Sequence, residues 1–322
     1  MTIAALTAQS PSTLHRLFSA ALRFERFSPE LLHEKLFENP RPGVDEYTVY
    51  GAFDGDDLIG AMQSVARPRD GRAWLGLFAV AERHRRHGVA TQLFEAVTAA
   101  WRAANIREAE ALAIPGNYFV PGLDPRYTPA LCLLERFGFS RFKDCVNLIA
   151  DLGRAAWKAA APDADRMSAV RPGPRDPFAT TDDEQKLAEQ GVTIRRATAD
   201  TDPLLDAFFT EHFGADWRLE VERARRISPP GVHLALADGR VIAFAAHSAM
   251  NREWGWFGPM GTAPQAEGRG IGRVLLRRCL ADLREAGHAT AIIPWVGPIG
   301  FYARHVPCRV HRVYWRYKLE LT

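Results

Sequence analysis

One pattern of a strand, a glycine-containing loop and a helix occurs twice in this chain at a constant spacing. Trp74–Val80 resembles Trp256–Thr262, and the loop Arg85–Ala90 resembles Glu267–Gly272. In both pairs the second member lies 182 residues after the first (74 to 256, 85 to 267). A register kept across a strand, a loop and a helix start indicates an internal duplication. We therefore expect two similar folded units.

The length and the composition of the middle of the chain agree with this division. A chain of 322 residues accommodates two domains of about 150 residues each. Between the repeats, the segment 157–190 is rich in proline, alanine and charge and has little apolar periodicity, which is typical of a linker. We expect an N-terminal domain over 1–153, a linker over 154–190 and a C-terminal domain over 191–322.

Each half has the element order of an α+β domain. In the second half the apolar patterns predict these strands: Val192–Ala197, Val232–Ala237, Val241–His247, Trp254–Thr262, Ala289–Pro294 and Val310–Leu321. They predict these helices: Pro203–Phe213, Trp217–Ile227, Gly270–Ala286 and Ile299–His305. The first half repeats the order, with strands near Leu58–Val65, Ala73–Val80 and Ala109–Ile114, and helices over Gly88–Ala104 and Thr128–Arg136.

Composition excludes several classes of protein. A net charge of +3 is too small for the concentrated basic face of a nucleic-acid reader. The four cysteines, Cys132, Cys145, Cys279 and Cys308, have no zinc-ligand spacing, so we expect no metal. The first residues lack the features of a signal peptide, and no apolar stretch approaches the ~20 residues of a membrane span. We expect a cytoplasmic protein that binds neither nucleic acid nor membrane.

The repeated loop suggests an anion site. The first N–H groups of a helix are unpaired and carry a partial positive charge, and glycine lets a phosphate approach them closely. A Walker loop requires GxxxxGK[ST], which is absent. A dinucleotide fingerprint requires a third glycine where Arg273 stands, and it opens the first βαβ unit. Here further strands and helices precede the loop, so neither fits.

Arg85-Arg86-His87-Gly88-Val89-Ala90 fits R/Q-x-x-G-x-G/A and resembles the pyrophosphate loop of the GCN5-related N-acetyltransferases (GNATs). Glu267-Gly268-Arg269-Gly270-Ile271-Gly272 fits except that Glu267 replaces Arg or Gln, while Arg269 and Arg273 keep this loop positive. The resemblance covers nearly the whole chain outside the linker and is to tandem members of the family. It implies two α+β domains, each with a mixed, mostly antiparallel sheet flanked by helices. It further implies acetyl-CoA as acyl donor, bound at Arg85–Ala90 and at Gly268–Arg273.

The resemblance also implies a tyrosine on the short helix after the fifth strand, which protonates the departing coenzyme thiolate. Tyr302 stands at that place in the second half, although His305-Val306-Pro307 replaces the usual Leu-Gly-Phe downstream. In the first half Leu134 occupies the tyrosine position. That half has instead the long loop 116–127, for which packing is favoured over covering a ligand. We therefore expect the chemistry in the second half.

A general base is harder to assign from the sequence. Glu253 and His247 are candidates, and each also has an ordinary structural explanation. A lysine-like amine of pKa about 10.4 would need a base at pH 7, whereas an amine of pKa near 8 would need little help. A weakly basic small-molecule amine is therefore the favoured acceptor. Trp254, Trp256 and Trp295 could offer flat apolar faces to an amino sugar.

The expected activity is transfer of an acetyl group from acetyl-CoA to a primary amine of a small molecule, by direct attack on the thioester. Three alternatives remain open: a non-catalytic acyl-CoA-binding or sensing module, a protein N-acetyltransferase, and catalysis in the first half. The sequence leaves the acceptor and the oligomeric state undetermined.

Overall fold

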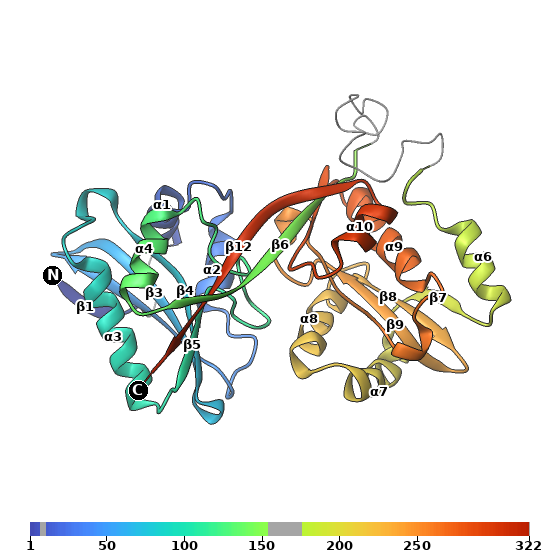
Figure 1. Cartoon of the computed structure of the whole chain (residues 1–322), viewed down its shortest axis with the longest axis horizontal. Coiled ribbons are helices and arrows are strands. Elements are labelled where there is room, and N and C mark those ends of the chain that lie inside the picture. Colours follow the sequence, from blue (N-terminus) through green and yellow to red (C-terminus); the bar gives the residue numbers. More distant parts are fainter. Residues whose placement is uncertain (7–10, 154–175, 322) are drawn as a thin grey trace. The chain divides into compact units, whose positions relative to one another are not determined.

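The computed structural model describes residues 1–6, 11–153 and 176–321. They pack into two compact units. Unit 1 comprises Met1–Cys145 and Val313–Thr322, and unit 2 comprises Val146–Arg312. Each unit combines helices with strands, so the α+β prediction is confirmed (Figure 1). The units divide the chain differently from the expected boundaries at 153 and 191, because each takes a strand end from beyond its own half.

Unit 1 places its helices around a sheet. Its helices are α1 (Pro11–Ala21), α2 (Pro29–Phe37), α3 (Val89–Ala103) and α4 (Thr128–Arg136). Its strands are β1 (Thr2–Ala5), β2 (Glu46–Asp54), β3 (Asp57–Arg67), β4 (Arg72–Val80) and β5 (Glu108–Ala111), with the first part of β6 (Ser140–Asp151) and the end of β12 (Cys308–Glu320). The strand order is β1-β2-β3-β4-β5-β12-β6. Of the pairings recorded among β1 to β5 and β12, only β4–β5 is parallel.

Unit 2 has a similar set of elements. Its helices are α6 (Thr181–Glu189), α7 (Asp202–His212), α8 (Ala215–Arg225), α9 (Ile271–Glu285) and α10 (Ile299–His305). Its strands are β7 (Thr193–Arg196), β8 (Val232–Ala237), β9 (Arg240–His247), β10 (Phe257–Thr262) and β11 (Thr290–Ile293). The antiparallel sheet runs β10-β9-β8-β7. A parallel bridge between Trp256 and Ile292 links the start of β10 to β11.

Helices cover both faces of strand β10. A side-chain atom added at Gly261 would lie 2.4 Å from the Phe213 ring, at the end of α7. The neighbouring Met260 instead lies against Gly272 of α9. Because successive residues of a strand point to opposite faces, α7 and α9 cover opposite faces of this strand. The apolar stripe predicted for α9 is confirmed, since Ile271, Val274, Leu275, Cys279 and Leu283 are all buried.

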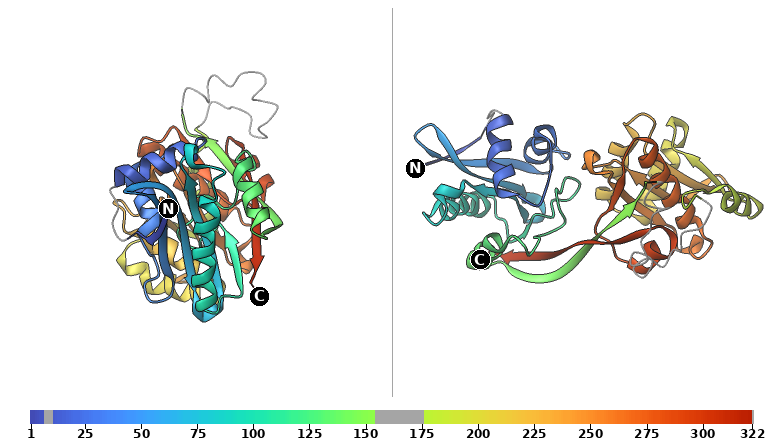
Figure 2. Two further views of the ribbon diagram at one scale, coloured as in Figure 1. Left: turned by 90° about the vertical axis from the view of Figure 1, so that its left-hand side faces the viewer. Right: turned by 90° about the horizontal axis from the view of Figure 1, so that it is seen from above.

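Two long strands carry the chain from one unit to the other. The end of β6 pairs with β11 of unit 2, from Leu148–Ile293 to Asp151–Thr290. The end of β12 pairs with β5 of unit 1, from Lys318–Glu110 to Glu320–Glu108. Both strands lie side by side in Figures 1 and 2. Where β12 is about to begin, Asp151 N–H donates to Pro307 O at 3.0 Å. The last residues of the chain therefore complete the sheet of unit 1.

Part of the expected linker is an ordered element of unit 2. Residues 154–175 lie outside the described residues, but α6 follows and docks on α9. Phe178 and Leu187 are buried in the core of unit 2. Glu184 pairs with Arg278, and Asp183 pairs with both Arg273 and Arg277. The apolar pattern of the sequence did not predict α6, because the helix is polar in composition and Leu187 is its one buried residue.

Within the described ranges, every helix is too short or too polar to cross a lipid bilayer.

Because the end of β12 belongs to unit 1, we expect Tyr317→Ala, a substitution near the end of the chain, to destabilise the N-terminal unit. Tyr317 is 1 % exposed and lies near the end of the chain, in unit 1. Removing its ring should destabilise unit 1 by about 3–5 kcal/mol. Hydrogen exchange should then show lost protection in β2–β4 and retained protection in β7–β9. Lost protection confined to β7–β9 would contradict the strand assignment.

Candidate active site

The two glycine loops have the same backbone conformation. Arg86 and Gly268, which are 182 residues apart, have φ values of 67° and 78°. Gly88 and Gly270 precede their helices at φ 79° and 82°. Helices α3 and α9 then each run for 15 residues. The predicted register is therefore kept through loop and helix. Glycine, which adopts the left-handed conformation easily, occupies three of these four positions, and Arg86 occupies the fourth.

The first N–H groups of both helices lack a capping side chain. Gly88 and Gly270 occupy the cap positions of α3 and α9, and neither helix start has a side-chain hydrogen bond. Unpaired N–H groups at a helix start, with left-handed glycines before them, form a favourable site for a phosphate. Both helix starts thus keep backbone N–H groups that no side chain caps, and binding at them stays a prediction.

The third glycine of the second loop, Gly272, brings α9 close to its neighbours. A side-chain carbon at Gly272 would lie 3.3 Å from Met260 of β10 and 3.4 Å from Phe301 of α10. The glycine therefore lets α9 pack tightly between these two elements. This contact holds the start of α9 and the helix of Tyr302 together in unit 2.

The charged side chains of the loops have other partners in the structure. In the first loop, Arg85 donates to Val80 O at 3.1 Å and so ties the loop to the end of β4. In the second loop, Arg269 donates to Gln190 O at 3.0 Å. Arg273 contacts Asp183 of α6 at 2.9 Å. Because Arg269 and Arg273 are engaged by Gln190 and Asp183, the backbone N–H groups are the donors of this loop that remain for an anion.

Both units have a bulge at the same place before the loop. In unit 1 the residues Gly76 and Leu77 face the single residue Gln63, and in unit 2 Gly258 and Pro259 face Ala246. Because a bulge leaves backbone groups outside the regular ladder, it commonly lies beside a functional site. The positions 76 and 258 again differ by the repeat spacing of 182 (76 to 258).

In unit 1 this bulge is closed by a buried side chain. Leu77 N–H donates to Gln63 Oε1 at 3.3 Å, and Gln63 Nε2 donates to Lys35 O at 2.6 Å. The buried Lys35 ammonium donates to Asn117 Oδ1 at 3.1 Å. Ala246 stands at the Gln63 position in unit 2 and has no polar group to do the same.

The long loop 116–127 packs within unit 1. Asn117 donates to the carbonyls of Glu34 and Glu38 on and after α2. Leu123 exchanges two backbone hydrogen bonds of 2.8 Å with Trp315 of β12. Tyr118 and Phe119 are also buried. The packing role favoured from the sequence is confirmed.

Tyr302, the predicted acid, is buried in unit 2. It is on α10, is 8 % exposed, and its ring packs against Phe257 of β10 with centroids 6.3 Å apart. Burial raises the pKa of Tyr302 to about 12, so the phenol stays protonated at neutral pH. In unit 1 the corresponding Leu134 is completely buried.

The other residues predicted from the sequence differ in how exposed they are. Glu253 is exposed on a short turn, Arg252–Trp254, before β10. Trp256 is 1 % exposed and forms part of the core, so it offers no face to a ligand. His247 is buried at the end of β9 and belongs to a polar cluster that the sequence did not reveal.

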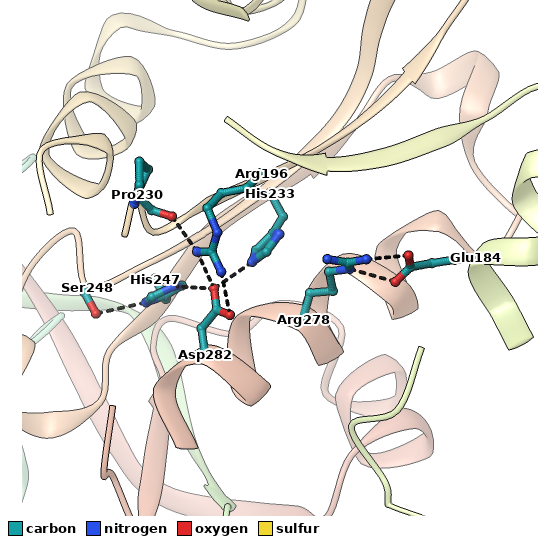
Figure 3. Close-up of polar contacts among 8 residues, drawn as sticks. All are labelled: Glu184, Arg196, Pro230, His233, His247, Ser248, Arg278 and Asp282. Carbon is teal, nitrogen blue, oxygen red and sulfur yellow. Dashed lines mark hydrogen bonds and ion pairs between the residues drawn. The ribbon is translucent and has the colours of Figure 1, made fainter. Parts of the chain in front are cut away.

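This cluster surrounds Asp282 of α9 (Figure 3). His233 Nε2 and His247 Nε2 lie 2.7 and 3.1 Å from Asp282 Oδ2, and Arg196 donates to both carboxylate oxygens. Burial alone would raise the pKa of Asp282, but the hydrogen bonds from His233, His247 and Arg196 together hold it well below its usual range. One sequence signal could have revealed this cluster: Asp282 is an acidic residue on the apolar side of α9, next to Cys279 and Leu283.

The electrostatic cost of Asp282→Asn follows from this geometry. A carboxyl with a depressed pKa in the folded state stabilises the protein above its unfolded pKa of about 3.9. We expect Asp282→Asn to lower the free energy of unfolding by about 3 kcal/mol at pH 7.5. The difference from wild type should narrow as the pH falls from about 4 towards about 2. Urea unfolding of both proteins measures this, and equal stability at pH 7.5 would contradict it.

Comparison with known proteins places these features in context. The family model described as the acetyltransferase (GNAT) family matches residues 13–118 and again 198–306. No curated protein matches the chain.

Solved structures share the tandem fold at low sequence identity. A glucosamine N-acetyltransferase region of a fungal multi-domain GH3 β-N-acetylglucosaminidase matches with a TM-score of 0.74 and 15 % identity, over 99 % of this chain and 38 % of that one. The chain thus spans about two fifths of that protein. A tandem GNAT protein of clavulanic acid biosynthesis matches at 0.67 and 15 %, over 99 % and 98 %. A GCN5-related N-acetyltransferase of Sphaerobacter thermophilus matches at 0.65 and 17 %, over 99 % and 95 %.

Proposed function

Because the chain belongs to the GNAT acetyltransferase family, we propose that it transfers an acetyl group from acetyl-CoA to a primary amine of a small molecule in unit 2. Family membership implies an acyl-CoA donor. The observation that carries the proposal is the pairing, in unit 2, of an uncapped helix start at Gly270 with a buried, protonated Tyr302. The cytoplasmic location and the absence of a metal stay predictions.

Unit 2 is favoured over unit 1 by three differences. At the position of Tyr302, unit 1 has Leu134, whose alkyl side chain has no proton to donate. Gln63 ties up the bulge of unit 1 through Leu77 N–H. The buried loop 116–127 follows β5 in unit 1, whereas a short turn leads from β11 to α10 in unit 2. Unit 1 can still hold a phosphate at its loop, but its interior supports packing better than turnover.

The backbone donors at Gly268–Arg273 would hold the diphosphate of the donor. The amine nitrogen attacks the carbonyl carbon of the thioester, a C–N bond forms, and the C–S bond breaks. Tyr302 donates to the sulfur as negative charge develops on it. Full transfer from a phenol of pKa about 12 to a thiolate of ordinary pKa is uphill by about 5 kcal/mol. Tyr302 therefore acts mainly as a hydrogen-bond donor to the sulfur. Its proton moves fully to the sulfur only when the phenol oxygen receives a proton from the attacking amine.

An amino sugar is the acceptor that we propose to test first. The solved structure with the highest TM-score of the three compared is described as a glucosamine N-acetyltransferase region, and its 15 % identity supports the fold alone. In this chain Phe213 and Trp217 stack with centroids 4.9 Å apart, and Trp217 is 38 % exposed. A flat aromatic face suits the apolar face of a sugar ring. The non-catalytic module and the protein acetyltransferase are the remaining alternatives.

The activity can be tested by thiol release from acetyl-CoA with a panel of amines: glucosamine, polyamines, aminoglycosides and peptides. Tyr302→Phe should lower kcat by about 10²-fold and leave the KM for acetyl-CoA nearly unchanged, because the hydroxyl acts only as the sulfur becomes charged. A wild-type chain that binds acetyl-CoA but releases no thiol with any amine would support the non-catalytic module. Release with peptides alone would support protein acetylation.

A further inference from the structure

A carboxylate of α9 and an imidazole and a hydroxyl at the end of β9 form a line of three side chains, each close to the next. His247 Nε2 lies 3.1 Å from Asp282 Oδ2, and its Nδ1 lies 3.0 Å from Ser248 Oγ (Figure 3). All three side chains belong to unit 2. The order is that of a proton relay, in which each group is within hydrogen-bond distance of the next.

Asp282 determines where the protons lie in this line. The carboxylate is an acceptor only, so the neutral form of His247 presents Nε2–H to it and keeps a lone pair on Nδ1. Ser248 O–H then donates to that Nδ1. Arg196 balances the carboxylate charge through two hydrogen bonds of 2.7 and 2.8 Å. The serine oxygen keeps its lone pairs for a further donor.

The backbone of Ser248 is held in an unusual conformation. Its φ of 57° lies in the left-handed region, which costs a residue other than glycine on the order of 1 kcal/mol and is often found at functional sites. Ser248 N–H donates to Trp256 O at 2.7 Å, and Arg252 Nε donates to Ser248 O at 3.1 Å. The surrounding chain therefore holds the backbone of Ser248 on both sides of its side chain.

The line ends where the thioester is expected. His247 pairs with Phe257 at the start of β10, and the ring of Tyr302 packs against that same Phe257. A diphosphate at Gly268–Arg273 would lie beyond the other end of β10. The extended pantetheine arm of the donor can follow a strand of this length. The hydroxyl of Ser248 and the phenol of Tyr302 would then approach the reacting atoms from two sides.

We propose that Ser248 is the catalytic group that receives the proton of the acceptor's ammonium, with His247 and Asp282 as positioning residues. This rests on the acetyltransfer proposed above. The ammonium N–H bond breaks and its proton passes to Ser248 Oγ, while the serine proton passes to His247 Nδ1. The neutral amine attacks the thioester, and imidazolium at His247, hydrogen-bonded to Asp282, later releases the proton to water. After the C–N bond forms, the second amine proton passes to the oxygen of Tyr302 as the phenol proton passes to the coenzyme sulfur, which leaves as the thiol.

His233 provides a matched control. It contacts the same Asp282 oxygen as His247, at 2.7 Å, but its Nδ1 has no hydrogen-bond partner in the described residues and leads to no hydroxyl. Loss of His233 should therefore weaken the fold like loss of His247, without interrupting the relay. His247→Gln and His233→Gln thus separate a structural effect from a chemical one.

The test compares acceptors of different basicity at pH 7. Ser248→Gly removes the hydroxyl at a backbone position that glycine adopts easily. We expect Ser248→Gly and His247→Gln to lower kcat/KM about 10²-fold for an amine of pKa about 10, which needs deprotonation, and less than about threefold for one of pKa about 8. His233→Gln should change both values by less than about twofold. Thermal unfolding of each variant confirms that the protein compared is folded.

The outcomes separate the two proposals. A folded Ser248→Gly variant with wild-type kcat/KM for the strongly basic amine overturns the relay and leaves the acetyltransferase standing. Equal losses for both amines, or equal losses in His233→Gln, also overturn it, because they indicate a purely structural effect. Wild-type protein that releases no thiol with either amine overturns the acetyltransferase, and the relay with it.

Discussion

One backbone arrangement underlies both halves of the chain: a strand enters a bend with two left-handed residues, and a helix begins directly after it without a side-chain cap. At Gly268 and Gly270 this bend turns β10 into α9 and leaves the first N–H groups of α9 as available donors. Gly272 then allows α9 to pack against Met260 and Phe301, which sets the position of α10 and Tyr302. The proposed place for a diphosphate and the position of the proposed acid, Tyr302, are therefore consequences of one local geometry.

The two copies have kept this geometry and changed what surrounds it. Gln63 fills the bulge of unit 1, and Ala246 leaves that of unit 2 without such a side chain. Helix α9 has arginines that pair with α6, whereas Thr91 and Glu95 stand at the positions of Arg273 and Arg277 in α3. A buried polar cluster around Asp282 distinguishes the second copy further. The differences between the copies therefore support the proposal that the chemistry belongs to unit 2.

The sequence predicted those features that local patterns encode. The spacing of 182 residues (88 to 270) located both loops, and apolar periodicity located α9 and α10 correctly. It missed α6, whose docking depends on ion pairs with α9, and it missed the pairing of the chain end with β5. It also read Trp254–Thr262 as one strand, although Arg252–Trp254 forms a turn and β10 begins at Phe257. Partners far apart in the sequence leave no periodic signal, and for that reason Ser248 and Asp282 were not candidates.

Binding of acetyl-CoA by loop variants tests the central claim most directly. Gly88→Glu and Gly270→Glu place the same side chain and the same strain at equivalent positions, with φ of 79° and 82°, so each controls for the other. Calorimetric titration with acetyl-CoA should show binding to the wild-type protein. In Gly270→Glu it should show loss of binding at unit 2, and thiol release should be lost as well. In Gly88→Glu thiol release should persist. Turnover that survives Gly270→Glu and disappears in Gly88→Glu, or wild type without any binding heat, would contradict the assignment of the chemistry to unit 2.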